Sequence, residues 1–281
     1  MPTELDRALA FQKAMIARCA ERIVPSRSGR AYFNDTFPRV WWLNFLLVDR
    51  GTPTDPGELA AEAELLHTDA GQSHRSIEIL DDAVGESAAP FFRRIGWQVE
   101  PLALMAYRGE GDRTADTSAV AEVERESLVP FREEIARAQP WATDEEAVRE
   151  VVAAVEVGAR AGNARFFAVL EDGRPVSAAQ LNSDGRVAEV DDVATLPDFR
   201  GRGHASAVTL RAVEEALAAG NELVFLLADD EDWPKQLYAR LGFEPIGRTW
   251  SFLRTPVLVA KDERRASSAL PRDCRVVSTS A

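Results

Sequence analysis

The stretch 191–206 constrains the fold of this chain more than any other part of the sequence, because a strand, a loop and a helix start follow one another in it. Gly201 and Gly203 lie in a basic turn directly before a predicted helix over residues 205–219. The apolar run 223–227 then predicts a buried strand. The sequence therefore predicts a strand–turn–helix–strand unit of the α/β class.

The turn has the features of a phosphate-binding site. The first turn of a helix leaves about four amides without an intrahelical acceptor, and the helix dipole favours an anion there. Gly201 and Gly203 let an anion approach the backbone, and Arg200 and Arg202 add permanently charged donors. A P-loop ending and a dinucleotide fingerprint are both excluded, the latter because Ser206 stands at its third glycine. Taken alone, the pattern also fits an exposed connecting loop.

A second motif follows in the stretch 237–243, which reads L-Y-A-R-L-G-F. With both motifs in order, the sequence resembles the GNAT superfamily of N-acetyltransferases over roughly residues 117–255. Arg200, Gly203 and Ala205 fill the fixed places of that family's acetyl-CoA signature, R/Q-x-x-G-x-G/A. The chain departs from the family pattern before the tyrosine, where it has Glu231 and Pro234. These two differences affect the expected contacts to the substrate more than the expected acetyl-CoA site.

The resemblance implies acetyl-CoA as cosubstrate and assigns a set of residues to it. Backbone amides of the strand end would hold the pantetheine arm and polarise the thioester carbonyl, while the turn would hold the pyrophosphate. The residues assigned to the cofactor are Val193, Ala194, Thr195, Arg200, Gly201, Arg202, Gly203, His204, Ala205 and Ser206.

Three side chains are candidates for the chemistry. Tyr238 could protonate the departing thiolate, because a free thiol has a pKa near 8.5 and a tyrosine near 10. The alternative for Tyr238 is a core aromatic whose hydroxyl is satisfied elsewhere. Asp191, and after it Glu189, could accept a proton from the amine, since strict strand alternation puts both on one face with Val193. The alternative for the two carboxylates is a solvated acidic strand edge.

The composition limits the kinds of partner that this protein is expected to have. A net charge of -13 argues against nucleic acid, whose binding is driven by basic surface. Three scattered histidines and two distant cysteines predict no metal site and free thiols in a reducing compartment. No apolar run is long enough for a membrane span, and a signal pattern is missing. We expect a cytoplasmic protein, a monomer or homodimer, that acts on a small-molecule amine.

The 281 residues fit two domains. The segment 91–97 echoes the motif 237–243 at an offset of about 146 residues, the difference between Gly96 and Gly242. At this offset Arg200, Gly201 and Arg202 correspond to Thr54, Asp55 and Pro56, and Tyr238 corresponds to Phe92. We therefore predict a degenerate GNAT-like domain over 1–112, an acetyltransferase domain over 113–256 and a weakly ordered tail over 257–281. The expected fold class is α/β (α+β), with two tandem GNAT-like domains, each a mixed, mostly antiparallel sheet flanked by helices.

The local patterns predict individual elements. Expected helices are 3–23, 58–66, 88–95, 128–137, 144–161 and 205–219, and expected strands are 40–48, 77–80, 97–107, 120–124, 164–171, 175–181, 187–195 and 223–227. In the helix 205–219, Leu210, Val213 and Leu217 are spaced for one buried face. Two functions follow from these features: an N-acetyltransferase that transfers directly in a ternary complex, or a non-catalytic CoA-binding or interaction module.

Overall fold

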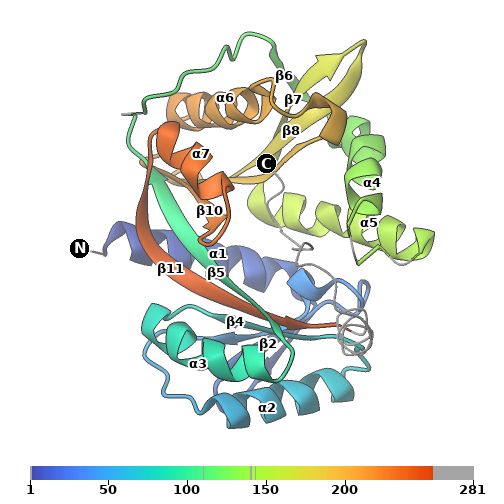
Figure 1. The fold of residues 1–281 in the computed structure, drawn as a ribbon. Coiled ribbons are helices and arrows are strands. Elements are labelled where there is room, and N and C mark those ends of the chain that lie inside the picture. Colours follow the sequence, from blue (N-terminus) through green and yellow to red (C-terminus); the bar gives the residue numbers. More distant parts are fainter. Residues whose placement is uncertain (1, 110, 140, 143, 256–281) are drawn as a thin grey trace. The chain divides into compact units, whose positions relative to one another are not determined.

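The computed structural model describes residues 2–109, 111–139, 141–142 and 144–255 (Figure 1). The chain forms two compact units. We call the unit of residues 2–15 and 103–247 the C-terminal unit, and that of residues 16–102 and 248–255 the N-terminal unit. The domain boundaries predicted at residues 112 and 256 stay a prediction. The predicted tail lies outside the described residues.

The C-terminal unit is built on a mixed sheet in which antiparallel pairs predominate. Its strands lie in the order β11-β5-β10-β9-β8-β7-β6, and β9 and β10 are parallel whereas β6 to β9 pair antiparallel. The bounds are β5 Gln98–Tyr107, β6 Val120–Val123, β7 Arg165–Glu171, β8 Arg174–Ser183, β9 Val187–Thr195, β10 Leu223–Asp229 and β11 Phe243–Arg254, of which β5 and β11 are divided between the two units. The turn between β7 and β8 is a two-residue hairpin in which Asp172 and Gly173 both have positive φ.

Helices flank this sheet. They are α1 Glu4–Cys19, α4 Val129–Arg137, α5 Glu145–Gly162, α6 His204–Ala218 and α7 Pro234–Arg240, with 3-10 turns at Arg125–Leu128 and Pro197–Phe199. Figure 1 shows α6 lying against the strands β7 and β8. The buried face of α6 is formed by Val208, Ala212, Val213 and Ala216, whereas Leu217 is 49% exposed. The prediction that Leu217 is buried is wrong, because small residues let the helix approach the sheet along a different stripe.

The strands of the N-terminal unit follow the order β1-β2-β3-β4-β11. Its further elements are β1 Arg22–Pro25, β2 Gly29–Phe33, a 3-10 turn at Trp41–Leu43, β3 Phe45–Val48, α2 Pro56–Asp69, β4 Arg75–Ile79 and α3 Asp82–Arg94. The helices α2 and α3 pack on one face, around a core that includes Leu59, Ile77, Phe92 and Phe252. The strands β3 and β4 are parallel and stay paired up to Val48 and Ile79, the last residue of each.

Several elements differ from the sequence-based expectations. The helix expected over 3–23 ends at Cys19, and β1 begins at Arg22. The strand expected over 40–48 is a strand only from Phe45, because the preceding aromatic segment forms a 3-10 turn. The short strands β1 and β2 and the long strand β11 were not predicted. Each finds its partner strand only through tertiary pairing, so local apolar periodicity gives little signal for them.

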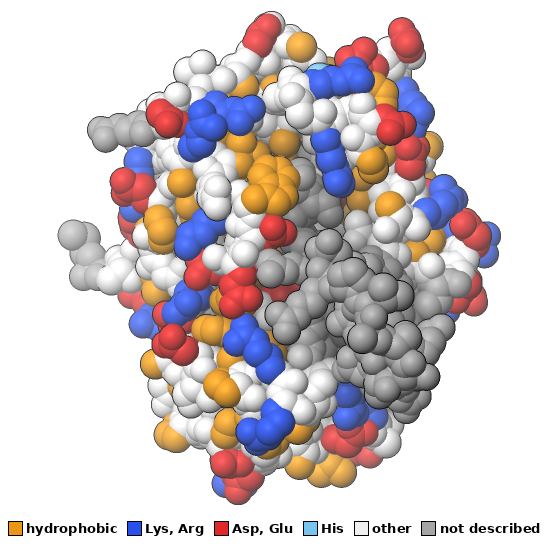
Figure 2. Space-filling view, in the orientation of Figure 1, with side chains coloured by type: hydrophobic (Ala, Val, Ile, Leu, Met, Phe, Trp, Pro, Cys, Tyr) orange, Lys and Arg blue, Asp and Glu red, His pale blue; other side chains and the backbone are white. Residues whose placement is uncertain are grey.

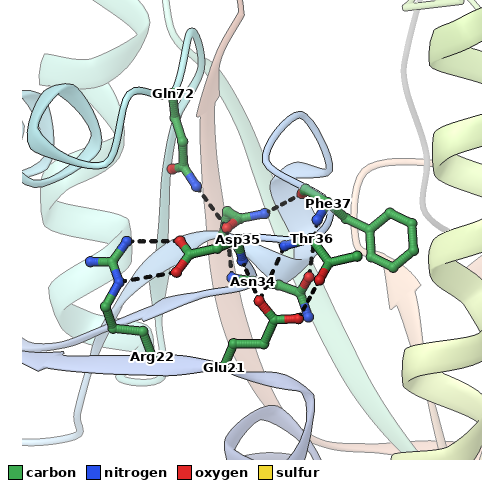
Figure 3. A network of polar contacts seen from close by, with 8 residues as sticks. Glu21, Arg22, Asn34, Asp35, Thr36, Phe37 and Gln72 are labelled. Carbon is green, nitrogen blue, oxygen red and sulfur yellow. Dashed lines mark hydrogen bonds and ion pairs between the residues drawn. The ribbon is translucent and has the colours of Figure 1, made fainter.

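Polar contacts fix the connection between β2 and β3 to the rest of the N-terminal unit (Figure 3). The carboxylate of Glu21 accepts the amides of Asp35 at 2.9 Å and Thr36 at 3.1 Å. The side-chain oxygen of Asn44 accepts the amide of Asn34 at 2.9 Å and the side-chain amide of Gln72 at 2.6 Å. These hydrogen bonds hold the connection between β2 and β3 in place.

The start of helix α2 is closed by its own side chain. The Asp55 carboxylate accepts the amides of Gly57 and Glu58, both at 2.9 Å, and Pro56 at the first helical position has no amide to offer. This end of α2 therefore has few free donors for an external anion.

We expect the Asp55→Ala variant to lose about 1 kcal/mol of unfolding free energy, since it leaves two amides without their acceptor. Urea unfolding measures the change. The matched control is Asp69→Ala at the exposed C-terminal end of the same helix, where a carboxylate opposes the dipole and its loss should be neutral or stabilising. Equal destabilisation by both variants would contradict the capping role.

Candidate functional site

The two parallel strands of the C-terminal unit separate after a short paired stretch. They pair only at Val187–Leu223, Ala188–Val224 and Glu189–Phe225, although β9 continues to Thr195 and β10 to Asp229. Within these fully described strands, the β9 edge beyond Glu189 therefore has no partner in β10. The predicted cofactor residues Val193, Ala194 and Thr195 lie on this stretch. A free strand edge can bind an extended ligand through its backbone groups.

A β-bulge in β9 accompanies the separation. The register with β8 shifts so that Gln180 faces Asp191 while Ala178 faces Ala194, and Asp192 has a φ of 50°. An extra residue bends a strand and increases its twist, which turns β9 away from a straight parallel partner. The expectation that Val193 shares the face of Asp191 is wrong, because the bulge puts Ala194 on that face instead.

The turn before α6 presents a row of backbone donors. Gly201 and Gly203 have φ values of 75° and 85°, and a Cβ at either position would meet nothing within 4 Å, so conformation rather than packing calls for glycine. The helix begins at His204, and its N-cap Gly203 provides no side-chain cap. In the described part of the chain, the amides of residues 201–206 have no protein acceptor. Such a row of amides at a helix N-terminus is suited to an anion.

Both arginines of the turn are anchored and exposed. Arg200 donates from Nε to the backbone oxygen of Thr195 at 3.2 Å. Arg202 donates to the backbone oxygen of Asp198 at 3.0 Å and lies over the ring of Phe199 at 4.9 Å. Each guanidinium keeps further N–H groups for a ligand. His204 and Ala205 are half-buried and Ser206 is buried, so these three residues contribute backbone amides rather than exposed side chains.

The phenol of Tyr238 is enclosed in the core of the C-terminal unit. The residue lies on α7, is 1% exposed and packs edge-on against Phe243 with 6.1 Å between ring centroids. Its hydroxyl has no hydrogen-bond partner among the described residues. Burial raises the pKa of Tyr238 far above its usual range, and the negative charge of Asp191 raises this pKa further. The phenol is therefore protonated at physiological pH and lies within electrostatic reach of Asp191.

Asp191 and Asp192 have different surroundings at the bulge. Asp192 binds Nε of Arg132, a buried residue of α4, at 3.0 Å. Asp191 is half-buried, and its carboxylate accepts the amide of Asp192 at 2.8 Å. Burial raises the pKa of Asp191, the charge of Asp192 raises it further, and Arg132 opposes the shift. A carboxylate with a raised pKa is a better base than an exposed aspartate.

Glu189 lies deeper than Asp191, with 6% exposure. Its carboxyl oxygens accept the side-chain amides of Gln12 at 3.0 Å and Asn182 at 3.4 Å. Burial raises the pKa of Glu189, the charge of Asp191 raises it further, and the two amides act in the opposite direction. With its buried carboxyl, Glu189 does not match the alternative of a solvated strand edge, and the role of Asp191 stays a prediction.

Sequence reasoning missed Gln12, Arg132 and Asn182. Gln12 lies near the start of the chain and reaches Glu189 only because residues 2–15 pack into the C-terminal unit. The period-two pattern of β8 and β9 would have been one available signal for Asn182, which faces Glu189 across the two strands.

The described residues contain no group of three or more His, Cys, Asp or Glu side chains that could hold a metal ion. Among the same residues, no helix combines the length and apolarity that crossing a membrane requires.

A helix start with unpaired amides, in a unit whose parallel strands separate, is suited to binding an anion. Residues 122–243 match the model of the acetyltransferase (GNAT) family. The match covers this segment of the chain, where it confirms the family resemblance predicted from the motifs, and the predicted fold class is confirmed as well.

Solved structures share the fold over most of the chain. A protein described as functionally unknown from Staphylococcus epidermidis ATCC 12228 is similar with a TM-score of 0.63 and 18% identity, over 84% of this chain and 94% of that chain. A GCN5-related N-acetyltransferase from Kribbella flavida gives 0.57 and 22%, over 89% and 95%, and one from Sphaerobacter thermophilus gives 0.51 and 13%, over 89% and 79%. At these identities the likeness shows the fold alone. No curated protein sequence matches the chain significantly.

Proposed function

We propose that this protein is an acetyl-CoA-dependent N-acetyltransferase that transfers the acetyl group directly to a primary amine of a small molecule in a ternary complex. The observation that supports this most is the set of unpaired amides at 201–206 next to the open edge of β9. Both features offer backbone donors, one to a pyrophosphate and the other to an extended pantetheine arm.

Different parts of the site would bind different parts of acetyl-CoA. The amides of 201–206 with Arg200 and Arg202 would hold the pyrophosphate. Amides of the stretch 193–195 would hold the pantetheine arm, and one of them would polarise the thioester carbonyl as negative charge develops on its oxygen. These roles need only backbone groups and exposed guanidiniums, which the site provides.

The transfer requires two proton movements. Asp191 accepts a proton from the substrate ammonium, directly or through a water, which gives a neutral amine. The amine nitrogen attacks the thioester carbon, the C–N bond forms, and the C–S bond breaks as the thiolate departs. Tyr238 gives its proton to the sulfur. The phenolate then regains a proton from the substrate nitrogen as this nitrogen becomes part of the amide. Glu189 is the second and more deeply buried carboxyl group of the pair.

The N-terminal unit supports the proposal by contrast. We infer that it is a copy of the same fold that has lost the cofactor site, since Asp55 occupies the amides at the start of α2 and β3 and β4 stay paired up to their last residues. Phe92, which replaces Tyr238 at the repeat offset, is fully buried and has no proton to give.

The proposed partners follow from charge. The net charge of -13 favours a cationic small molecule over nucleic acid. Figure 2 shows basic and acidic side chains interspersed on the face in view, without a continuous basic patch. We propose a monomer or homodimer without nucleic-acid or membrane partners.

Incubation with acetyl-CoA and a pool of polyamines, amino acids, aminoglycosides and peptides tests the proposal. We expect at least one amine to raise the release of free thiol, read with a thiol reagent, well above the background without amine. Mass spectrometry should show that amine to be heavier by one acetyl group. Binding of acetyl-CoA without thiol release for any amine would instead support a non-catalytic CoA-binding module.

A further inference from the structure

The polar face of the strands β8 and β9 holds a chain of side chains that begins on helix α1. Gln12 donates to Glu189 at 3.0 Å, Asn182 donates to the other oxygen of Glu189 at 3.4 Å, and Gln180 donates to Asn182 at 2.8 Å. Asn182, Gln180 and Glu189 are 0%, 4% and 6% exposed. Because Gln180 faces Asp191 across the two strands, the chain ends beside the proposed base.

The first turns of α1 make two further contacts within the C-terminal unit, both before Gln12. Phe11 is 3% exposed and meets Phe225 edge-on with 5.9 Å between centroids. Arg7 pairs with Glu222 at 2.9 Å. The side chain of Gln12 is therefore delivered by a helix that is anchored before it reaches the site.

We infer that Gln12 is a positioning residue for the transfer reaction, acting through Glu189: its side-chain amide holds the Glu189 carboxyl in the interior and leaves Asp191 as the carboxylate that accepts the substrate's proton. This inference rests on the proposed function. It means that the catalytic unit draws a residue from the first turns of the chain, far in sequence from the acetyl-CoA motifs.

The contact is expected to govern when Glu189 ionises. The charged groups that face the pair are Asp192 on the same strand and Arg132 from α4, the phenol of Tyr238 from α7 is a further titratable group, and Gln12 and Asn182 contribute neutral amides. A donated hydrogen bond favours the carboxylate over the carboxylic acid. Loss of the Gln12 donor therefore raises the pKa of Glu189 and delays the second negative charge beside Asp191.

The first experiment tests the Gln12–Glu189 hydrogen bond without measuring catalysis. It follows the glutamate carboxyl groups of the full chain by carbon-13 NMR during a pH titration, and the Glu189→Gln variant assigns the Glu189 signal. We expect Gln12→Met, and independently Gln12→Ala, to move the Glu189 midpoint upward by about one pH unit. The matched control is Arg7→Gln, which breaks a partly exposed ion pair while the buried Phe11 still holds the same helix, and which should therefore leave the midpoint unchanged. Equal midpoints in wild type and both Gln12 variants would overturn the inference.

The second experiment reads the consequence for turnover, from the pH profile of kcat at saturating amine. We expect Gln12→Met to shift the alkaline part of the profile upward by about one pH unit. We expect no such shift in a Glu189→Gln background, because residue 189 can no longer ionise there. The same shift in both backgrounds would overturn the positioning role. A wild-type protein that releases no thiol overturns the proposed function and the role with it, whereas an active protein that ignores Gln12 overturns the role alone.

Discussion

Tyr238→Phe is expected to lower turnover by about a hundredfold or more while leaving the affinity for acetyl-CoA nearly unchanged. The substitution removes only the hydroxyl, which has no hydrogen-bond partner among the described residues, and keeps the ring that packs against Phe243. Folding should therefore be preserved. Without the phenol, the thiolate has to leave without a positioned acid, and that loss appears in kcat.

Tyr107→Phe is the matched control for this prediction. Tyr107 lies on β5 and packs against the same Phe243, with 5.2 Å between centroids, but it belongs to no part of the proposed mechanism. Steady-state kinetics and a CoA titration on both variants, with the best amine from the pool, separate the loss of an acid from a general packing effect. An unchanged kcat in Tyr238→Phe would remove this phenol from the mechanism.

The second large effect is expected from the double variant Arg200→Ala with Gly203→Glu, which should abolish the stabilisation by acetyl-CoA. The wild-type protein should gain about 2.7 kcal/mol at a hundredfold excess of ligand over its Kd. In the variant, a carboxylate stands among the amides that would bind the pyrophosphate, at a position with a φ of 85° that disfavours any side chain. Arg200→Ala removes a charged donor as well.

Gly220→Glu is the control, because it imposes the same kind of strain at the other end of α6. Gly220 has a φ of 87°, and a Cβ there meets nothing within 4 Å. This variant should melt earlier than wild type yet keep the full shift with acetyl-CoA in thermal unfolding. Survival of the shift in the double variant would place the cofactor elsewhere.

The local parts of the site could be predicted from the sequence. Gly201, Gly203 and the two arginines are close together in the chain, so their geometry follows from backbone preferences and the helix start alone. The strand β9 was predicted with its observed bounds, Val187–Thr195. The position of Tyr238 on a helix that Pro234 opens also follows from nearby residues.

The side-chain faces of β9 could not be predicted in this way. The bulge at Asp192 breaks the period of two, and its cause lies in the pairing with β8 rather than in the residues of β9. For the same reason the separation of β9 from β10 has no sequence pattern of its own.

The sequence by itself determined the class of fold, the resemblance to the GNAT family and the amide-lined turn, because these depend on residues within a few positions of one another. Only the tertiary structure decided the surroundings of the carboxyls, with Gln12 and Asn182 on Glu189 and Arg132 on Asp192. These partners come from elements far apart in the chain, and the burial that raises both carboxyl pKa values exists only once those elements pack together.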